Sequence, residues 1–327
     1  MATLFLDRAE LEVRHIDGAL AIYEAGTRSA TVPIKLLERV VLQGARTRLD
    51  TGTLIKLAEA GVATLLLSPR ASRQVAIVLG PAHNDAAIRL AQCQHVADAA
   101  FCAGWARDLV ITKIRRQRRL LDTALGQRPD LRKPLFDAAA QLDAALTRLG
   151  AAPAQDCATL RGVEGSAARA YFHGFCTLFA SELDFTGRNR RPPRDPVNAC
   201  LSLGYTLLHF DAVRAAHCSG LDPLLGFYHR PAFGRESLAS DLIEPLRPHI
   251  DAWVWQQFAG RTLRPEHFSS EKGGCLLGKA GRGRFYAAWE KFSPAHRRWL
   301  RLRCAALARS LRKAGEPLLA STEDESF

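Results

Sequence analysis

The chain has 327 residues and a formal net charge of +12, with 45 Lys and Arg against 33 Asp and Glu. A hydrophobic content of 47% excludes a disordered or fibrous protein, and the absence of any apolar run of about 18 residues excludes a membrane-spanning helix. The basic excess favours a polyanionic partner, although a basic enzyme without a nucleic-acid role has the same composition.

The first eighty or so residues predict a β-rich domain with one short helix. Asp17-Gly18 between two apolar segments is typical of a two-residue hairpin turn. A helix is predicted from Asp50 to Ala60, capped by Asp50 or Thr51 and ended by Gly61. Strands are predicted over residues 1–8, 11–16, 19–23, 40–42, 62–67 and 75–79, and the first of them lacks the basic region of a signal peptide.

After Pro81 the spacing of apolar residues is helical almost throughout. Long helical segments are predicted over residues 86–125, 135–149, 160–179, 198–218, 242–258 and 296–313. We therefore expect an α+β protein, with a small β-rich domain over residues 1–80 followed by a larger all-α catalytic domain over residues 81–327. The acidic tail at residues 323–325 is expected to be frayed.

Eight cysteines without CxxC spacing indicate small buried residues in a reducing compartment rather than disulfides or a zinc site. We therefore expect a soluble cytoplasmic protein.

Arginine and lysine gather in three segments of the helical region. These clusters lie at residues 113–119, 188–194 and 297–303. A helix can simply solvate such charges, but three clusters in one domain favour salt-sensitive binding to phosphates that is indifferent to sequence.

Two places suggest chemistry. Glu164 lies between Gly162 and Gly165, which predicts close backbone approach around this acid, although a glutamate placed near a helix start by the helix dipole is an equal alternative. Farther on, His229 ends a turn rich in Gly and Pro, and Glu244 belongs to a series of polar residues spaced three apart.

That series consists of Asp241, Glu244 and Arg247, which a helix would make neighbours. Pro245 fits the first turn of a helix, so Glu244 is expected near a helix N-terminus. Two carboxylates and one imidazole suit Mg²⁺ or Mn²⁺ better than a thiol-rich zinc site does. The alternative is that Asp241 and Glu244 merely pair with Arg247.

Two other motifs are excluded. There is no HExxH, so a zinc protease is not expected. The glycine-rich segment Gly273–Lys279 has the spacing of a phosphate-binding loop, but Ala280 stands where a Mg²⁺-binding hydroxyl should be, and no apolar strand precedes it.

Four segments, in order along the chain, resemble motifs of the CRISPR-associated adaptation integrases, the larger of the two universal spacer-acquisition proteins. They are Gly162–Phe172, Arg190–Ser202 with Gly204-Tyr205, Gly220–Pro223 with Gly226–His229, and Asp241–Pro248. The N-terminal region matches only as the β-rich domain expected of that family.

The resemblance implies that Glu164, His229 and Glu244 bind a catalytic Mg²⁺ or Mn²⁺, with Asp241 assisting. It also implies DNA contacts from Arg169, Tyr171, Arg190, Arg191, Asn198, Tyr205 and Arg247. The implied partners are prespacer and repeat DNA, a second copy of the chain bound through the β-rich domain, and a small ferredoxin-like adaptation protein.

The implied reaction is attack by the 3′-hydroxyl of a captured DNA fragment on a phosphodiester of a CRISPR repeat. A metal-dependent nuclease for branched DNA would use the same residues without acquiring spacers. A non-enzymatic DNA-binding scaffold would need none of them.

Overall fold

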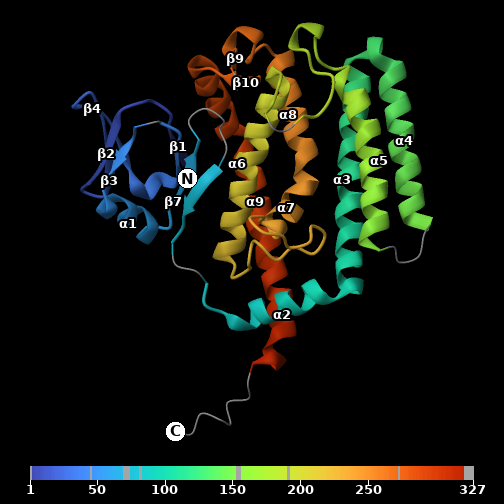
Figure 1. Cartoon of the computed structure of the whole chain (residues 1–327), viewed down its shortest axis with the longest axis horizontal. Coiled ribbons are helices and arrows are strands. Elements are labelled where there is room, and N and C mark those ends of the chain that lie inside the picture. The colour runs from blue at the N-terminus through green and yellow to red at the C-terminus, as the bar shows by residue number, and fades with distance from the viewer. Residues whose placement is uncertain are drawn as a thin grey trace. The chain divides into compact units, whose positions relative to one another are not determined.

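The computed structural model describes residues 2–44, 46–68, 74–80, 83–151, 156–189, 192–271 and 273–319. The chain forms two compact units, one made of residues 1–83 with 286–291 and the other of residues 84–285 with 292–327 (Figure 1). The sequence places a boundary at residue 80 and does not predict that Tyr286–Lys291 belongs with the first unit. No helix of the described ranges is long and apolar enough to cross a membrane.

The described part of residues 1–83 contains two four-stranded sheets, the helix α1 and a short 3₁₀ turn. One sheet has the order β1-β5-β7-β8, with β8 antiparallel to β7 and the other pairs parallel, and the second has the order β4-β3-β2-β6. The elements are β1 (Ala2–Leu6), β2 (Leu11–Ile16), β3 (Ala19–Glu24), β4 (Thr27–Pro33), β5 (Leu37–Leu42), β6 (Arg48–Leu49), α1 (Thr51–Glu59), β7 (Ala63–Leu67) and β8 (Gln74–Val78).

Local signals account for much of this unit. Asp17 and Gly18 both have positive φ, 47° and 73°, as the predicted hairpin between β2 and β3 requires. The carboxylate of Asp50 accepts the N–H of Thr53 at 2.7 Å and so caps α1, and Gly61 follows the helix with φ of 69°. The predicted hairpin and helix are therefore confirmed.

A short stretch of the last helix completes the first unit through polar and aromatic contacts. The guanidinium of Arg39, whose side chain is fully buried, pairs with Glu290 at 3.5 Å, and Glu290 also accepts the N–H of Thr3 at 3.1 Å. Tyr286 stacks on Phe5 with ring centroids 3.9 Å apart. These contacts join residues far apart in sequence, so no local pattern predicts them.

The second unit is mostly helical. Its elements are α2 (Ala86–Ala97), α3 (Ala99–Gln127), α4 (Arg132–Ala151), α5 (Cys157–Cys176), α6 (Pro196–Cys218), α7 (Ser237–Ile243), a 3₁₀ turn η4 (Glu244–Leu246), α8 (Arg247–Ala259), β9 (Phe268–Glu271), β10 (Gly274–Leu277) and α9 (Lys279–Gly315). The long helices α3, α4 and α5 run side by side in Figure 1, and Gly174 of α5 is so close to α4 that a Cβ would lie 2.8 Å from that of Ala138.

Several sequence expectations for this unit need correction. The segment predicted to be helical from Ala86 to Leu125 is two helices, because the side chain of Asp98 accepts the N–H groups of Ala100 and Phe101 and starts α3 afresh. The last helix begins at Lys279 rather than near His296, and it contains Pro294. The predicted helix covers only the part of α9 that follows Pro294.

The unit is also not all-α, because β9 and β10 form an antiparallel hairpin. β9 is a strand although only Phe268 in it is strongly apolar. The glycine-rich segment that imitates a phosphate-binding loop is β10 itself, so it is not a loop that opens a helix around a phosphate. None of the eight cysteines forms a disulfide, and Cys93 and Cys218 are exposed rather than buried.

Candidate metal and DNA site

Glu164 lies within α5, eight residues from the capping Asp156, and is therefore not at the helix start. A Cβ added to Gly162 or Gly165 would meet nothing within 4 Å. The expected close backbone approach around Glu164 is thus wrong, and so is the alternative of a glutamate held at a helix start. The two glycines instead leave open space beside the carboxylate.

Glu244 opens the 3₁₀ turn η4, and Pro245 follows at a position where its missing N–H is harmless. The predicted place near a helix N-terminus is confirmed, since α8 begins at Arg247. Arg247 pairs with Glu244 through Nε and Oε1 at 2.9 Å. Asp241 instead binds His229 and the backbone before it. The alternative in which both carboxylates pair with Arg247 is therefore correct for Glu244 and wrong for Asp241.

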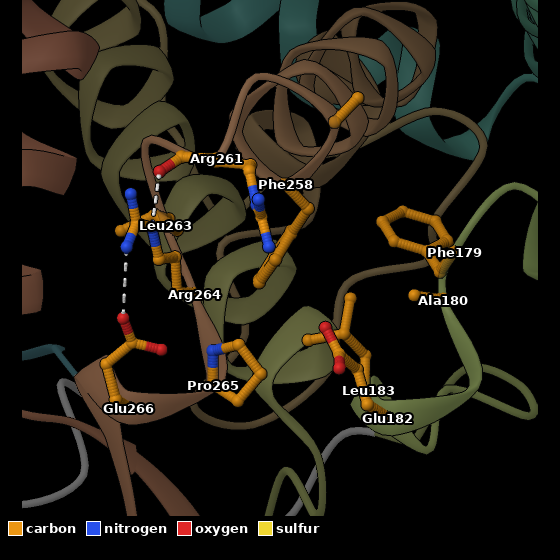
Figure 2. A pocket seen from close by; sticks show the side chains of 11 residues that line it. Phe179, Ala180, Glu182, Leu183, Phe258, Arg261, Leu263, Arg264, Pro265 and Glu266 are labelled. Atoms are coloured by element: carbon orange, nitrogen blue, oxygen red, sulfur yellow. Dashed lines mark hydrogen bonds and ion pairs between the residues drawn. The ribbon is translucent and has the colours of Figure 1, made fainter.

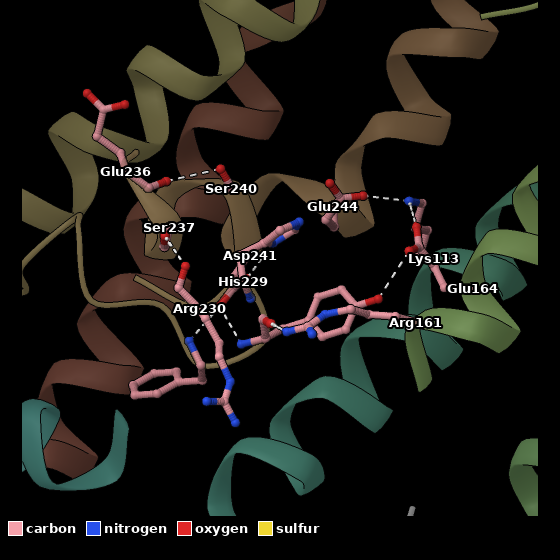
Figure 3. Close-up of polar contacts among 12 residues, drawn as sticks. Lys113, Arg161, Glu164, His229, Arg230, Glu236, Ser237, Ser240, Asp241 and Glu244 are labelled. Carbon is pink, nitrogen blue, oxygen red and sulfur yellow. Dashed lines mark hydrogen bonds and ion pairs between the residues drawn. The ribbon is translucent and has the colours of Figure 1, made fainter. Parts of the chain in front are cut away.

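The side chain of Lys113, from α3, lies between Glu164 and Glu244 (Figure 3). Its Nζ is 2.6 Å from Oε2 of Glu244 and also pairs with Oε1 of Glu164. Burial alone would raise the pKa of Glu244, but the charges of Arg247 and Lys113 outweigh burial and lower the pKa to about 2. Glu244 is therefore ionised at neutral pH.

Lys113 itself stays charged because the two carboxylates stabilise its ammonium group. Burial would lower its pKa, but the two carboxylates raise it above the ordinary value. From the sequence, Lys113 is predicted only as a member of a basic cluster, and its place between the two carboxylates is not predicted. A signal was present, because Lys113 falls on the same helical stripe as the buried Val110, Ile114 and Gln117.

His229 is held by Asp241, whose side chain is fully buried. Oδ1 of Asp241 lies 2.7 Å from Nδ1 of His229 and accepts its backbone N–H at 2.8 Å, while Oδ2 accepts the N–H groups of Phe227 and Tyr228. Both oxygens are thus engaged behind the imidazole. A proton on Nδ1 that faces Asp241 leaves the Nε2 lone pair free for a ligand.

Close packing fixes the turn that carries His229. A Cβ on Gly226 would lie 2.6 Å from the carbonyl carbon of Ser237 and 2.7 Å from the carbonyl oxygen of His229. This turn requires a glycine at position 226, because its backbone touches the start of α7. Gly162 and Gly165 have no such close contact.

Tyr228 connects this turn to α5. Its hydroxyl donates to Oε2 of Glu164 at 3.1 Å, and its carbonyl accepts from Arg161 at 2.8 Å. His229 is also near enough to Glu244 that a protonated imidazole would lower the pKa of Glu244. The structure therefore brings Glu164, His229 and Glu244 into one region.

Within the described residues, no three His, Cys, Asp or Glu side chains surround one point closely enough to hold a metal ion as they stand. The place between the two glutamates belongs to the ammonium of Lys113. The donor chemistry fits a divalent ion, since a cation already bridges the two carboxylates and an imidazole stands nearby.

Arg247 starts a buried row of side chains behind Glu244. Its guanidinium lies over the ring of Tyr205, 4.6 Å from the centroid, and the hydroxyls of Tyr205 and Tyr171 both donate to Asp251. Burial raises the pKa of Asp251 to about 6, and the two hydroxyls only partly oppose this. Sequence reasoning missed Asp251, which has no motif partner nearby in the chain.

This row corrects some of the expected DNA contacts. Tyr171 and Asn198 are 0% exposed and Tyr205 is 8% exposed, so Tyr171 and Asn198 offer no surface to a DNA strand and Tyr205 offers little. Asn198 instead binds Asp195 and the carbonyl of Gly187, which fixes the start of α6. Tyr171 and Tyr205 therefore belong to the row behind Glu244, whereas Asn198 orders the segment before α6.

The arginines differ in accessibility. Arg169 is exposed on α5, whereas the side chain of Arg247 is only 21% exposed. The predicted contacts Arg190 and Arg191 lie outside the described residues. Within the basic clusters, Arg297 is buried and Arg118 is engaged by Asp122 and Asp143, so the clusters contain fewer free charges than the sequence suggests.

A cavity of about 540 Å³ lies away from this chemistry (Figure 2). Its walls come from the segment after α5, the end of α8 and the segment that follows α8, and include Phe179, Leu183, Phe258, Arg261 and Pro265. No residue predicted to be functional lines it, so this cavity is separate from the candidate site.

A β-rich unit followed by a mostly helical unit that gathers carboxylates, an imidazole and arginines has side chains suited to an enzyme that acts on nucleic-acid phosphodiesters. The sequence profile of the family described as CRISPR associated protein Cas1 matches residues 4–291. The chain belongs to the CRISPR-associated Cas1 family, which confirms the predicted family, the α+β fold and the class of enzyme.

Known relatives and structures agree with this assignment. CRISPR-associated endonuclease Cas1 1 of Thermodesulfovibrio yellowstonii is 36% identical over 294 residues, 89% of this chain and 91% of the relative. CRISPR-associated endonuclease Cas1 2 of Rhodospirillum rubrum is 36% identical over 285 residues, 84% of this chain and 80% of the relative.

Two solved structures share the fold. A casposase bound to an integration product has a TM-score of 0.84 at 21% identity, covering 97% of this chain and 92% of that chain. A Cas1 protein from Thermotoga maritima has a TM-score of 0.81 at 20% identity, covering 95% of this chain and 97% of that chain.

Proposed function

We propose that the chain inserts captured DNA fragments into a CRISPR array with a divalent ion, Mg²⁺ or Mn²⁺, held by Glu164, His229 and Glu244. The observation that carries the proposal is the pair of carboxylates bridged by a cation beside an imidazole with an orienting carboxylate. Such a bound ion would stabilise the charge that develops on phosphorus and activate the attacking 3′-hydroxyl.

The side chains have separate tasks in this proposal. Glu244 is already ionised, with a pKa of about 2, so it offers its oxygens without losing a proton first. Asp241 positions His229 rather than binding the ion, because both of its oxygens are engaged. The side chain of Arg247 is 21% exposed and adjoins Glu244, where it could meet a phosphate.

DNA binding is proposed to follow exposed arginines rather than the buried tyrosines. Arg169 is the accessible member of the motif on α5, and Arg190 and Arg191 remain predictions from sequence. Contacts of this kind neutralise phosphates and make binding depend on salt.

Two protein partners are proposed as well, a second copy of this chain through the β-rich unit and a small ferredoxin-like adaptation protein. β4 supports the first, because it is an edge strand whose residues are mostly exposed and is open to pairing. For the second, a solved complex of a Cas6-RT-Cas1 protein with Cas2 contains a chain with this fold, at a TM-score of 0.80 and 24% identity; the match covers 95% of this chain and 35% of that one.

The test mixes the protein with a duplex that carries a 3′-hydroxyl and a plasmid that carries a repeat, in Mn²⁺. The wild type should join the ends, and Glu164→Ala should abolish joining. Joining at the wild-type level by Glu164→Ala would refute the ligand assignment. Robust cutting of branched DNA without joining would favour the nuclease. DNA binding that needs neither Glu164 nor a divalent ion, with neither joining nor cutting, would favour a scaffold.

A further inference from the structure

We propose that Lys113 is a tethered cation that competes with the divalent ion for Glu164 and Glu244. The ion can bind both carboxylates only after the ammonium has left the position between them. This inference rests on the proposed function, since it concerns the same two carboxylates.

The position of Lys113 is unusual for a lysine, because its side chain is only 10% exposed. It extends from the buried stripe of α3, between Val110 and Gln117, toward carboxylates that come from α5 and η4. Three segments distant in the sequence thus meet at one ammonium group.

The remaining oxygens of the two carboxylates are also occupied. Oε2 of Glu164 accepts the hydroxyl of Tyr228 at 3.1 Å, and Oε1 of Glu244 pairs with Arg247 at 2.9 Å. The oxygens that face each other are those bound by Lys113, Oε1 of Glu164 and Oε2 of Glu244. A metal ion that joins the two carboxylates needs these same oxygens.

An ammonium and a divalent ion cannot both use that place. Both require the lone pairs of the facing oxygens, and Mg²⁺ binds oxygen at about 2.1 Å, so the two cations would lie within a few ångströms of each other. Like charges at such a distance repel strongly in a site with little water. The ion therefore displaces the ammonium from at least one carboxylate.

Without a metal, the ammonium has a clear structural purpose. Glu244 is buried and Glu164 is only 22% exposed, so two carboxylates that face each other here repel and are costly to desolvate, and a cation between them offsets both effects. Lys113 thus keeps α3, α5 and η4 assembled in the metal-free protein. The same contact weakens metal binding, because the ion must replace an existing cation.

The test measures Mn²⁺ binding by calorimetry in the whole chain for the wild type, Lys113→Met and Arg115→Met. Arg115 is exposed on the same helix, so Arg115→Met removes an equal charge away from the carboxylates. We expect Lys113→Met to bind Mn²⁺ about tenfold tighter or more, the scale on which neighbours of metal ligands change affinity, and Arg115→Met to match the wild type. The double variant Lys113→Met/Glu164→Gln should lose the gain.

A second measurement follows thermal unfolding with and without Mn²⁺. Without metal, Lys113→Met should unfold at a lower temperature than the wild type. Mn²⁺ should then raise the unfolding temperature of Lys113→Met more than that of the wild type. If Lys113→Met does not fold without metal, Lys113→Gln, which keeps a polar group at this place, is measured in the same way.

The outcomes separate the two proposals. If the wild type binds Mn²⁺ and removal of the Lys113 charge leaves the affinity equal or weaker, the competition is refuted and the metal site stands. If the wild type, Lys113→Met and Lys113→Gln all fail to bind Mn²⁺, the metal assignment itself is refuted. Binding by the Lys113 variants but not by the wild type supports the competition in its strongest form.

Discussion

Oδ1 of Asp241 lies 2.7 Å from Nδ1 of His229, and the same carboxylate accepts three consecutive backbone N–H groups, those of Phe227, Tyr228 and His229. One buried side chain therefore sets both the turn and the direction of the imidazole at its end. A ring held in this way directs Nε2 away from Asp241, as is common for histidines that bind metal.

Asp241→Asn tests this positioning. The amide has one acceptor oxygen in place of two, so some of the N–H donors lose their partner, and we expect the free energy of unfolding to fall by about 1–3 kcal/mol. Because the imidazole is no longer oriented, Mn²⁺ should bind about 10–100-fold more weakly. Denaturant unfolding and calorimetry measure the two effects.

Asp222→Asn is the matched control for Asp241→Asn. Asp222 also accepts a backbone N–H, that of Leu224 at 2.8 Å, in the segment before the turn. Its substitution should leave Mn²⁺ affinity unchanged. If Asp241→Asn lowers stability but not Mn²⁺ affinity, then Asp241 serves only to hold the turn.

Gly226→Ala should distort the same turn from the opposite side. The added Cβ meets backbone atoms of Ser237 and His229 at 2.6 and 2.7 Å, and these atoms cannot move without shifting α7 or the histidine. We expect a loss of about 1–3 kcal/mol in unfolding free energy, together with weaker Mn²⁺ binding.

Gly162→Ala provides the contrast, because open space surrounds Gly162 on α5. Alanine is the better helix former, so this variant should gain roughly 0.5–1 kcal/mol in stability. Comparable destabilisation by Gly226→Ala and Gly162→Ala would mean that the close approach at Gly226 is unimportant.

Arg169→Ala tests the proposed DNA track. The guanidinium is exposed, so its removal should barely change the unfolding temperature while DNA affinity falls for duplexes of unrelated sequence. The slope of log affinity against log salt should become shallower by about one. An unchanged slope would show that Arg169 does not contact phosphate.

The sequence predicts features that short stretches of chain determine. The hairpin at Asp17-Gly18 and the cap at Asp50 depend on neighbouring residues, and both are confirmed. Tyr286 was not predicted to join the first unit, because its partners Phe5 and Gln43 are more than 200 residues away in sequence.

The candidate site shows the same limit. Motif resemblance singles out Tyr171 and Asn198 but cannot tell a packed side chain from one that contacts DNA, and burial makes both structural. Lys113 could have been found, because a lysine on an apolar helical stripe needs buried acidic partners. Asp251 could not have been found from the sequence, because only the fold brings it to Tyr171 and Tyr205.

The carboxyl group of Asp251 makes a prediction about pH. Burial raises its pKa to about 6, against 3.8 in an unfolded chain, so between these values the folded protein binds more protons than the unfolded one. The contribution of Asp251 to stability is therefore largest at low pH and is lost as pH rises through about 6. Asp251→Asn removes this contribution and keeps a partner for the hydroxyls of Tyr171 and Tyr205.

We expect the unfolding free energy of Asp251→Asn minus that of the wild type to rise by up to about 3 kcal/mol from pH 4 to pH 6.5, and to be level above that. Denaturant unfolding at a series of pH values measures this difference, which cancels the titration of other groups. Asp137→Asn, at an exposed helix position, should give a difference that hardly depends on pH. A level difference for Asp251→Asn across the whole range would mean that Asp251 is ionised throughout, balanced by the nearby charges of Arg188 and Arg247.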